Sequence, residues 1–460
     1  MRGGMSPLWT AAEIAAATGG VASTPFEASG VAFDSREVGP GDLFVALKGE
    51  TTDGHRFVAQ ALAQGAAGVL VSEEMAGPQV RVADTAAALD ALGRAGRART
   101  GAKIVGVTGS VGKTSVKEAL YRALDRAVPG AAHRSLKSYN NHVGVPLSLA
   151  RMPRETRFGV FEMGMNHAGE LAALTRLARP HVALVTAIAF VHGAFFADEA
   201  AIADAKGEIF QGLEPGGTAI IPYDSPHRER LIAAARPYAA EIVTFGRDEA
   251  ADVSARAGFA TRRGTLVSAR LRTHELTFTI AQPGEHWISN ALAVLAAVEA
   301  AGGDLTAAGV ALAELEGLPG RGRRIRIPAG EGSALLIDEA YNASPTSMRA
   351  TLKVLGAEPA RRRIAILGAM RELGPEESRF HAELAAPIAD ANVDFALLVG
   401  SEMAALADAL EGRVAFAHVA DAAEAADRAA ALIAAEDAIL VKGSNSVGLA
   451  RVVDALAGAA

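Results

Sequence analysis

At residues 106–115 the chain reads Gly106-Val107-Thr108-Gly109-Ser110-Val111-Gly112-Lys113-Thr114-Ser115. An apolar run from Ile104 enters this stretch, and a run typical of a helix, Val116 to Leu120, leaves it. Where a strand, a glycine-rich turn and a helix follow in this order, backbone N–H groups converge on phosphate oxygens and the helix dipole favours negative charge. The stretch therefore predicts a nucleotide-binding loop over residues 109–115.

Two side chains of this loop have predicted roles in phosphate chemistry. Lys113 places a point charge at the outer phosphates, and the Thr114 hydroxyl is a ligand for Mg²⁺. The stretch departs from the standard pattern, which has glycine where this chain has Val107; here a glycine, Gly109, appears two positions later. The alternative is an ordinary strand-to-helix turn with a surface lysine. A nucleotide hydrolase, a kinase, a molecular switch and a ligase are all compatible with the loop alone.

Short β-branched runs alternate with alanine-rich helical stretches along the rest of the chain. Such strands, separated by helices, predict parallel sheets covered on both faces, and thus an α/β fold. A length of 460 residues indicates two or three domains. Breaks in pattern near residues 95–103 and 318–322 predict domains at 1–100, 101–318 and 319–460. The clearest predicted strands are Ile104–Val107, Ala183–Val185, Ile364–Leu367, Phe395–Val399 and Ala438–Val441.

Bulk composition narrows the class of protein. A net charge of −7 argues against a nucleic-acid-binding surface, and the absence of cysteine excludes disulfides, thiolate metal sites and a cysteine nucleophile. The first residues, Met1 to Pro7, lack the apolar segment of a secretion signal. The longest apolar run, Val182 to Val191, is about half a membrane span long and is interpreted as a buried strand. We expect a cytoplasmic protein that does not insert into membranes.

Three further residues are candidates for metal or phosphate chemistry. The apolar run from Phe158 ends in Glu162, which places a carboxylate at the edge of a parallel sheet where ligands bind. Glu162 is therefore predicted to hold Mg²⁺ opposite the phosphate loop, although a structural glutamate at a helix N-terminus fits equally well. Local chemistry does not single out His192, which follows another strand, or Lys206, which lies on a helix.

Together these motifs resemble the Mur ligase family, which makes amide bonds on cytoplasmic precursors of bacterial peptidoglycan. The resemblance is carried by the loop at 108–115, by Glu162-Met163-Gly164 and by Ala205-Lys206-Gly207-Glu208-Ile209, and it covers nearly the whole chain. It implies three α/β domains: a small N-terminal domain for the UDP end of the substrate, a central parallel-sheet ATPase domain with the phosphate loop, and a Rossmann-like C-terminal domain that closes the site and binds the acceptor.

Details of the motifs favour one branch of this family. Residues 34–50 and 53–57 resemble the nucleotide-sugar-binding part, while residues 109–117, 161–167 and 367–374 resemble the branch that adds D-alanyl-D-alanine. The sibling branch that adds the third amino acid has an Asp-Asn-Pro-Arg motif, which is absent from the C-terminal third. The resemblance thus implies an ATP-dependent ligase that joins D-alanyl-D-alanine to UDP-N-acetylmuramoyl-tripeptide through an acyl phosphate, in cell wall biogenesis that supports cell shape and cell division.

The resemblance also assigns roles to single residues. It implies that Lys206 is carbamylated and holds a second Mg²⁺, and that His192 is a metal-site histidine, so that Lys113, Glu162, His192 and Lys206 form the catalytic set. The sequence departs from the family pattern after His192 and again at Asn445, where relatives commonly have arginine. The remaining implied contacts are to ATP from Asn290, Arg321, Asp338 and Asn342, and to the substrates from Ser35, Arg36, Asn141 and Lys442.

Two kinds of alternative stay open from the sequence. Within amide ligases, the chain could be the sibling that adds the third amino acid or a folylpolyglutamate-type ligase. In a different class, a nucleotide-binding switch would bind ATP without acceptor-dependent phosphate release. We expect a monomer that acts on small molecules and binds no nucleic acid.

Overall fold

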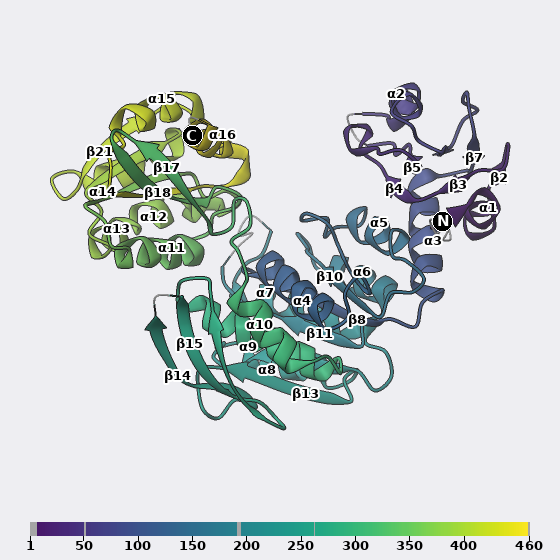
Figure 1. Cartoon of the computed structure of the whole chain (residues 1–460), viewed down its shortest axis with the longest axis horizontal. Coiled ribbons are helices and arrows are strands. Elements are labelled where there is room, and N and C mark those ends of the chain that lie inside the picture. Colours follow the sequence, from purple (N-terminus) through teal and green to yellow (C-terminus); the bar gives the residue numbers. More distant parts are fainter. Residues whose placement is uncertain (1–6, 50–51, 191–194, 262, 459–460) are drawn as a thin grey trace.

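The computed structural model describes residues 7–49, 52–190, 195–261 and 263–458. Within these ranges the strands form three main sheets, each at the centre of a separate lobe, and the lobes follow one another along the chain (Figure 1). The predicted fold class, three α/β units with mostly parallel strands, is confirmed. None of the helices in the described ranges has both the length and the apolar character needed to cross a membrane.

The N-terminal lobe is built on a five-stranded sheet of order β2-β7-β6-β5-β4, with a two-strand pair, β1 and β3, beside it. Strands β4 to β7 are parallel, and only β2 runs antiparallel to its neighbour. The strands are β1 Trp9–Thr10, β2 Val21–Ala22, β3 Glu27–Ala28, β4 Gly30–Ala32, β5 Asp42–Val45, β6 Gly68–Val71 and β7 Gln79–Arg81; the helices are α1 Ala11–Thr18, α2 Val58–Ala63 and α3 Thr85–Ala98.

The central lobe has a nine-stranded sheet of order β16-β15-β14-β13-β12-β11-β8-β10-β9. Helices α4, α9 and α10 bury one face, and α5 to α8 bury the other. The strands are β8 Lys103–Thr108, β9 Ala132–Arg134, β10 Phe158–Glu162, β11 Val182–Val185, β12 Thr218–Pro222, β13 Glu241–Gly246, β14 Val253–Thr261, β15 Gly264–Arg270 and β16 Glu275–Ile280; the helices are α4 Lys113–Ala127, α5 Gly144–Ala150, α6 Glu170–Ala178, α7 Glu199–Gly207, α8 Arg228–Ala235, α9 His286–Ala300 and α10 Leu305–Ala313.

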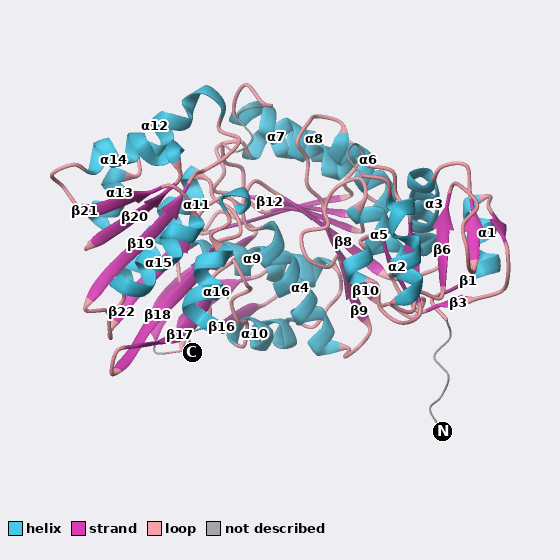
Figure 2. Cartoon of the chain, turned by 90° about the horizontal axis from the view of Figure 1, so that it is seen from above, coloured by secondary structure: helices cyan, strands magenta, loops and turns pink. Residues whose placement is uncertain are grey.

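The C-terminal lobe has a six-stranded sheet of order β17-β18-β22-β19-β20-β21, covered on both faces by helices (Figure 2). All its strand pairs are parallel except β17 with β18. The strands are β17 Arg323–Ala329, β18 Gly332–Glu339, β19 Arg362–Gly368, β20 Phe395–Val399, β21 Ala415–Val419 and β22 Asp437–Lys442; the helices are α11 Pro345–Ala357, α12 Glu377–Ala382, α13 Ala385–Asp390, α14 Ala404–Leu410, α15 Ala422–Leu432 and α16 Ala450–Gly458.

Two details of the sheets differ from the sequence prediction. The sheets are not parallel throughout, because β14, β15 and β16 form an antiparallel edge of the central sheet. The apolar run from Val182 is a strand only as far as Val185, which pairs with Thr108, the last residue of β8. Beyond that pair β8 turns into the phosphate loop, so residues 186–190 have no strand to pair with and form a loop; Val191 lies outside the described residues.

The N-terminal lobe shares its apolar core with a helix of the central lobe. Leu147 and Ala150 of α5 are buried among the core residues of the N-terminal lobe. Helix α3 packs so closely on α5 that a Cβ atom at Gly96 would lie 2.3 Å from the Leu149 carbonyl oxygen. The Trp9 indole N–H donates to the Ala150 carbonyl oxygen (2.8 Å). The domain boundary predicted at residue 100 stays a prediction. Apolar side chains from both sides of it pack in one core.

Candidate active site

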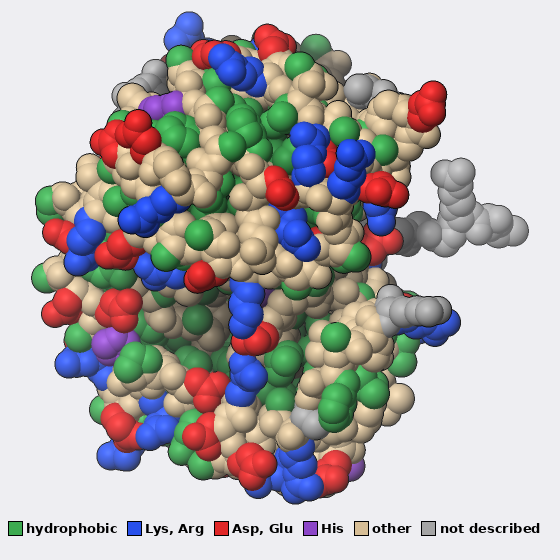
Figure 3. All heavy atoms as spheres, turned by 90° about the vertical axis from the view of Figure 1, so that its left-hand side faces the viewer, with side chains coloured by type: hydrophobic (Ala, Val, Ile, Leu, Met, Phe, Trp, Pro, Cys, Tyr) green, Lys and Arg blue, Asp and Glu red, His purple; other side chains and the backbone are tan. Residues whose placement is uncertain are grey.

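A cavity of about 530 Å³ lies where the central and C-terminal lobes meet, a size typical of small-molecule sites. The phosphate loop and α9 line it from the central lobe, and residues of β18, α11 and β22 line it from the C-terminal lobe. On the face drawn in Figure 3, which includes the outer side of the C-terminal lobe, acidic and basic side chains are interspersed.

The backbone of the phosphate loop requires glycine at two positions. Gly109 has φ of 148°, and a Cβ atom there would lie 1.9 Å from the Thr186 hydroxyl oxygen. Gly112 has φ of 85° and stands directly before the first residue of α4. Only glycine adopts such angles without strain, and the close approach at Gly109 leaves no room for a side chain. Local backbone geometry thus explains why the loop has glycine at both of these positions, 109 and 112.

The side chain of Lys113 folds back over the loop. Its ammonium group donates to the carbonyl oxygen of Gly109 (2.7 Å). Burial lowers the pKa of Lys113, the positive charge of Arg321 lowers it further, and the nearby Glu162 carboxylate opposes both effects. A lysine held in this way at the start of a helix is placed to meet an anionic group in the cavity.

Glu162 emerges from the end of β10 onto the phosphate loop, as its strand position predicts. It is 1% exposed, and one carboxylate oxygen accepts a hydrogen bond from the Thr114 hydroxyl (2.8 Å). The other accepts from the side-chain amide of Asn140 (2.7 Å). These oxygens are hard donors of the kind Mg²⁺ prefers. The alternative was a structural glutamate that accepts backbone N–H groups at a helix N-terminus. It does not describe these two hydrogen bonds, because both donors are side chains.

Lys206 is buried near the end of α7, with 1% of its surface exposed. Burial lowers its pKa well below the ordinary value, and the charge of Lys113 lowers it further. The side chain therefore favours the neutral amine more than a surface lysine does.

The chain enters the C-terminal lobe through a turn that also reaches the site. The Asp338 carboxylate accepts from the backbone N–H groups of Gly320 (2.7 Å) and Ala340 (3.2 Å), and burial raises its pKa. The turn places Arg321 over the ring of Tyr341, 4.1 Å from its centroid, and Arg321 donates to the Ser138 hydroxyl (3.3 Å). Arg321 thus bridges the two lobes beside the cavity.

Lys442, at the end of β22, brings a second buried ammonium group to the cavity. It is 2% exposed, donates to the carbonyl oxygen of Asn342 (2.9 Å) and lies 3.4 Å from the Glu339 carboxylate. Burial lowers its pKa, although Glu339 acts in the opposite direction. The C-terminal lobe therefore offers cationic groups to the same cavity as Lys113.

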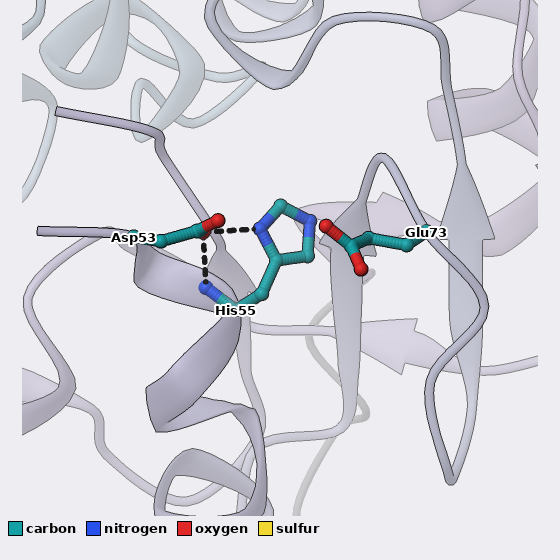
Figure 4. Close-up of side chains that lie close together, drawn as sticks. All are labelled: Asp53, His55 and Glu73. Carbon is teal, nitrogen blue, oxygen red and sulfur yellow. Dashed lines mark hydrogen bonds and ion pairs between the residues drawn. The ribbon is translucent and has the colours of Figure 1, made fainter.

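A different cluster, in the N-terminal lobe, resembles a metal site by composition. In the described part of the chain, Asp53, His55 and Glu73 bring three possible ligand atoms within 4.8 Å of one another (Figure 4). However, His55 Nε2 accepts the backbone N–H of Ser72 (2.9 Å), so Nδ1 carries the proton and donates to Asp53 (2.6 Å). The Lys48 ammonium lies 3.3 Å from Glu73 and 3.8 Å from Asp53. Both ring nitrogens of His55 and both carboxylates therefore already have partners.

Three family models match the chain in order: the Mur ligase family catalytic domain at residues 27–102, the Mur ligase middle domain at 107–298 and the Mur ligase glutamate ligase domain at 323–445. UDP-N-acetylmuramoyl-tripeptide–D-alanyl-D-alanine ligase of Escherichia coli is 36% identical over 434 residues, which cover 93% of each chain. The chain belongs to the Mur ligase family.

Solved structures of family members agree with this assignment. A crystal structure of MurF from Acinetobacter baumannii has a TM-score of 0.84 and 31% identity, covering 98% of this chain and 99% of the other. MurF ligase from Thermotoga maritima, in complex with ADP, has a TM-score of 0.78 and 26% identity, covering 94% and 97%. The fold and the order of its domains are therefore those of Mur ligases.

The structure brings most of the residues predicted from the Mur ligase resemblance to one cavity and leaves others outside it. Asn141 accepts backbone N–H bonds at the start of α5, and the exposed Arg36 pairs with Asp34 (2.6 Å). His192 lies outside the described residues. The predicted residues that line the cavity are Ser110, Val111, Gly112, Lys113, Thr114, Ser115, Glu162, Asn290, Arg321, Asn342 and Lys442. The predicted residues that the described lining does not include are Gly109, Lys206, Asp338, Asn141, Ser35 and Arg36.

Several lining residues were not singled out by the sequence. Ser138 and Asn140 reach the site from the loop before α5, and Tyr341 supports Arg321 from the C-terminal lobe. The Ser138-Tyr139-Asn140-Asn141 stretch offered a weak signal, because it carries two neighbouring amides in a loop. Which amide turns toward Glu162 depends on the backbone, and it is Asn140.

Proposed function

We propose that this chain is an ATP-dependent ligase that joins D-alanyl-D-alanine to UDP-N-acetylmuramoyl-tripeptide in peptidoglycan precursor synthesis. The observation that carries this proposal is the cavity in which the phosphate loop and Glu162 of the central lobe meet the Arg321 and Lys442 side chains of the C-terminal lobe. Similarity to the Escherichia coli ligase over nearly the full length of both chains supports the choice of substrates.

ATP fits the central side of the cavity. This side of the cavity offers three kinds of group that commonly bind phosphates: backbone N–H groups at the start of α4, the Lys113 ammonium and the Arg321 guanidinium. Lys113 donates to the loop carbonyl oxygens, and we infer that it exchanges these contacts for the outer phosphates when ATP binds. Asn290 and Asn342, which line the same cavity, are proposed to contact the nucleotide.

The residues beside the phosphate loop fit Mg²⁺. Thr114 and Glu162 present hydroxyl and carboxylate oxygens 2.8 Å apart at the cavity wall, and both are hard donors. Bound Mg²⁺ would neutralise charge on the transferring phosphoryl group. We propose His192 and a carbamylated Lys206 as further metal ligands. A carbamate forms when a neutral amine bonds to carbon dioxide and loses a proton, and the lowered pKa of Lys206 favours that neutral amine.

The reaction follows from the chemistry of the two substrates. A carboxylate is a poor electrophile at neutral pH, so transfer of the γ-phosphoryl group to it creates an acyl phosphate with a good leaving group. Lys113 lowers the repulsion between the two anionic reactants. The amine of D-alanyl-D-alanine then attacks the carbonyl carbon, phosphate leaves and the amine loses a proton. Because water would hydrolyse the acyl phosphate, we propose that the C-terminal lobe closes over the cavity during turnover.

The two remaining substrates are assigned to the outer lobes. We propose that the N-terminal domain, residues 1–100, binds the UDP end with Ser35 and Arg36, and that the C-terminal domain, residues 319–460, binds D-alanyl-D-alanine near Lys442. Lys442 is buried at the cavity and could meet a carboxylate there. The Arg36 side chain is 83% exposed, and we propose that it exchanges its ion pair with Asp34 for a diphosphate. We further propose a cytoplasmic monomer, since one chain supplies both sides of the cavity.

One assay tests this function and its alternatives. Purified protein is given ATP, Mg²⁺ and UDP-N-acetylmuramoyl-tripeptide, and phosphate release is measured with and without D-alanyl-D-alanine. We expect release to depend on both substrates and to yield the pentapeptide product by mass spectrometry. Activity with UDP-N-acetylmuramoyl-dipeptide and a diamino acid would indicate the sibling ligase, and activity with folate and glutamate would indicate the folylpolyglutamate type. ATP binding without acceptor-dependent release would indicate a nucleotide-binding switch.

A further inference from the structure

The loop at residues 135–141, called here the junction loop, lies between β9 and α5. Its two ends are tied to β10 and the residues after it. The Ser135 backbone N–H donates to the Val160 carbonyl oxygen (3.1 Å), and the Gly164 N–H donates to the Asn140 carbonyl oxygen (2.8 Å). The loop therefore runs alongside the strand that ends in Glu162.

Side chains of the junction loop contact two different lobes in opposite directions. The Tyr139 hydroxyl donates to the Glu37 carboxylate of the N-terminal lobe (2.7 Å), and Lys137 forms an ion pair with the same carboxylate. Burial raises the pKa of Glu37, but the hydrogen bonds from Lys137 and Tyr139 outweigh it and lower the pKa overall. Ser138 meanwhile accepts from Arg321, which enters from the turn to the C-terminal lobe (3.3 Å).

The same loop contacts the proposed metal site. Asn140 donates to Glu162 (2.7 Å), and the Ser138 hydroxyl lies 3.5 Å from the Thr114 hydroxyl. Both proposed protein oxygens for Mg²⁺ therefore have a neighbour on the junction loop. A small displacement of this loop would change the positions of Thr114 and Glu162 together.

The middle of the loop is held by a lysine that the proposed chemistry does not use. Lys117 is fully buried in α4. Its ammonium donates to the carbonyl oxygens of Ser135 (2.9 Å) and Lys137 (2.7 Å) and lies 2.9 Å from the Glu118 carboxylate. Two of its N–H groups thus have backbone acceptors, and the Glu118 carboxylate compensates its charge. A buried charge with these partners holds them in one arrangement.

The backbone of the loop needs this support. Lys137 has φ of 50°, a conformation that is uncommon for residues other than glycine and costs free energy. This turn directs the Lys137 carbonyl oxygen toward the Lys117 ammonium. Without that ammonium, the carbonyl would lose its buried partner and the uncommon backbone conformation would lose what stabilises it.

Lys117 also links the loop to the phosphate loop through one helix. It follows Lys113 by four residues and Thr114 by three, and these spacings place all three on neighbouring positions of the same helix face. The first turn of α4 thus carries the phosphate lysine and the metal-site hydroxyl, while the next turn holds the junction loop that faces them.

We propose that Lys117 is a positioning residue for the metal site: by fixing the junction loop, it sets where Asn140 and Ser138 hold Glu162 and Thr114. This inference rests on the proposed function, because it concerns how Mg²⁺ and ATP are held during ligation. Lys117 is not among the described residues that line the cavity, and it acts through two backbone carbonyl groups.

The first experiment uses Lys117→Met in the full chain, which keeps the length of the side chain and removes the ammonium. The rate of acceptor-dependent phosphate release is titrated against Mg²⁺. We expect the half-saturating Mg²⁺ concentration to rise roughly 10- to 100-fold, as for other groups that orient metal ligands, and kcat to fall by about 100-fold. The KM for D-alanyl-D-alanine should change little, since that substrate is proposed to bind in the other lobe.

A matched control separates positioning from stability. Leu124 is buried on the same helix in the apolar core, and Leu124→Ala removes packing without removing a contact to the junction loop. We expect Leu124→Ala to lower Tm while its Mg²⁺ dependence stays that of the wild type. If Lys117→Met lowers Tm and leaves the Mg²⁺ dependence unchanged, Lys117 has only a structural role and the proposal is wrong.

A second pair of variants tests the loop should Lys117→Met fail to fold. The side chain of Lys137 is 65% exposed, so substitutions there disturb no core. Proline cannot adopt φ of 50°, whereas glutamine can. We expect Lys137→Pro to raise the Mg²⁺ requirement as Lys117→Met does. Lys137→Gln loses the ion pair with Glu37 and the contact of the ammonium with the Tyr139 ring but keeps the backbone conformation, so we expect it to leave the Mg²⁺ requirement unchanged. Equal Mg²⁺ dependence of these two variants would overturn the proposal.

The two proposals fail in distinguishable ways. If the wild-type protein shows no acceptor-dependent phosphate release, the proposed function fails; the role of Lys117 is then tested by the Mg²⁺ dependence of ATP binding, measured by calorimetry. If the wild type is active and neither Lys117→Met nor Lys137→Pro shifts the Mg²⁺ dependence, the proposed function stands and the positioning role is wrong.

Discussion

Carboxylates that could bind a metal ion lie in two parts of this protein, and their surroundings differ. Glu162 lines the cavity between two lobes, and its hydrogen-bond donors, Thr114 and Asn140, are neutral. Asp53 and Glu73 lie in the N-terminal lobe, where His55 and the Lys48 ammonium already supply donors and positive charge. A cation that enters the cavity would therefore find at Glu162 a carboxylate whose hydrogen-bond donors are neutral, with the Lys113 ammonium nearby. At His55 it would have to displace a lysine and a backbone hydrogen bond.

The comparison shows that the types of ligand atom do not define a metal site. The N-terminal cluster satisfies every test of composition and spacing, but both ring nitrogens of its histidine are occupied. The Glu162 site has a single carboxylate, and its relevance comes from the adjacent phosphate loop and cavity. We therefore expect substitutions on the cavity side to change the Mg²⁺ and ATP dependence of ligation, and substitutions in the N-terminal cluster to change only stability.

The largest effect is expected from Lys113→Ala. Removing the ammonium leaves the outer phosphates without their cationic partner, so we expect the ligation rate to fall by about 10³-fold or more. The fold should be kept, because Lys113 contacts mainly loop carbonyls. Steady-state kinetics together with circular dichroism tests this, and near-normal turnover in a folded variant would remove the phosphate loop from the reaction.

Lys206→Ala should have the next largest effect. If Lys206 carries a carbamate, the variant loses an anionic metal ligand, and we expect activity to fall by roughly 10²-fold. Short carboxylates such as acetate should restore part of it by occupying the vacated position. Mass spectrometry under native conditions, in the presence of bicarbonate, should show the added carbon dioxide on the wild type; an unmodified lysine and no rescue would contradict the idea.

Glu162→Gln keeps the shape of the side chain and removes its charge. We expect the Mg²⁺ requirement to rise by about tenfold and phosphoryl transfer to slow, with little change in Tm. A structural glutamate predicts the reverse, namely a lower Tm with an unchanged Mg²⁺ requirement. Activity titrated against Mg²⁺, beside a melting curve for each protein, decides between the two roles.

His55→Phe tests the other side of the comparison. The substitution keeps a ring of similar size but leaves the Ser72 N–H and the Asp53 carboxylate without their partner. We expect the free energy of unfolding of the N-terminal lobe to fall by about 1–3 kcal/mol, measured by denaturant titration. The Mg²⁺ dependence of ligation should stay that of the wild type, and a shifted dependence would show that the cluster is a metal site after all.

The smallest expected effect is a pH dependence of stability that arises from His133, which lies in β9 beside the strand that carries Glu162. Burial lowers the pKa of His133 to about 4, while its ring hydrogen-bonds the Ser148 carbonyl oxygen. Because the unfolded state binds this proton more readily, stability from this residue is present above pH 6.5 and is lost as pH falls toward 4. We expect at most about 2 kcal/mol to be lost between pH 7 and pH 5. His133→Gln, which does not titrate, should flatten this part of a Tm-against-pH curve; identical curves would contradict the assignment.

Sequence patterns predicted the elements that depend on neighbouring residues. The apolar runs that become β8, β10, β19, β20 and β22 were recognisable because a buried parallel strand needs a continuous apolar stretch. The phosphate loop was recognisable because glycine angles and a helix start are local requirements. The antiparallel edge β14–β16 was not predicted, and the apolar run from Val182 was expected to continue as a strand beyond Val185, since both features depend on which strands lie beside them.

Sequence alone thus determined the fold class, the family and the position of the phosphate loop, because backbone geometry and apolar periodicity act over a few residues. Tertiary structure alone decided that Asn140 rather than Asn141 faces Glu162, that α5 completes the N-terminal core, and that Lys117 holds the loop between them. These contacts join residues on different strands and helices, and their distances are set by the order of strands in the sheet. No local pattern records that order, so the arrangement of the site becomes visible only when the lobes are packed together.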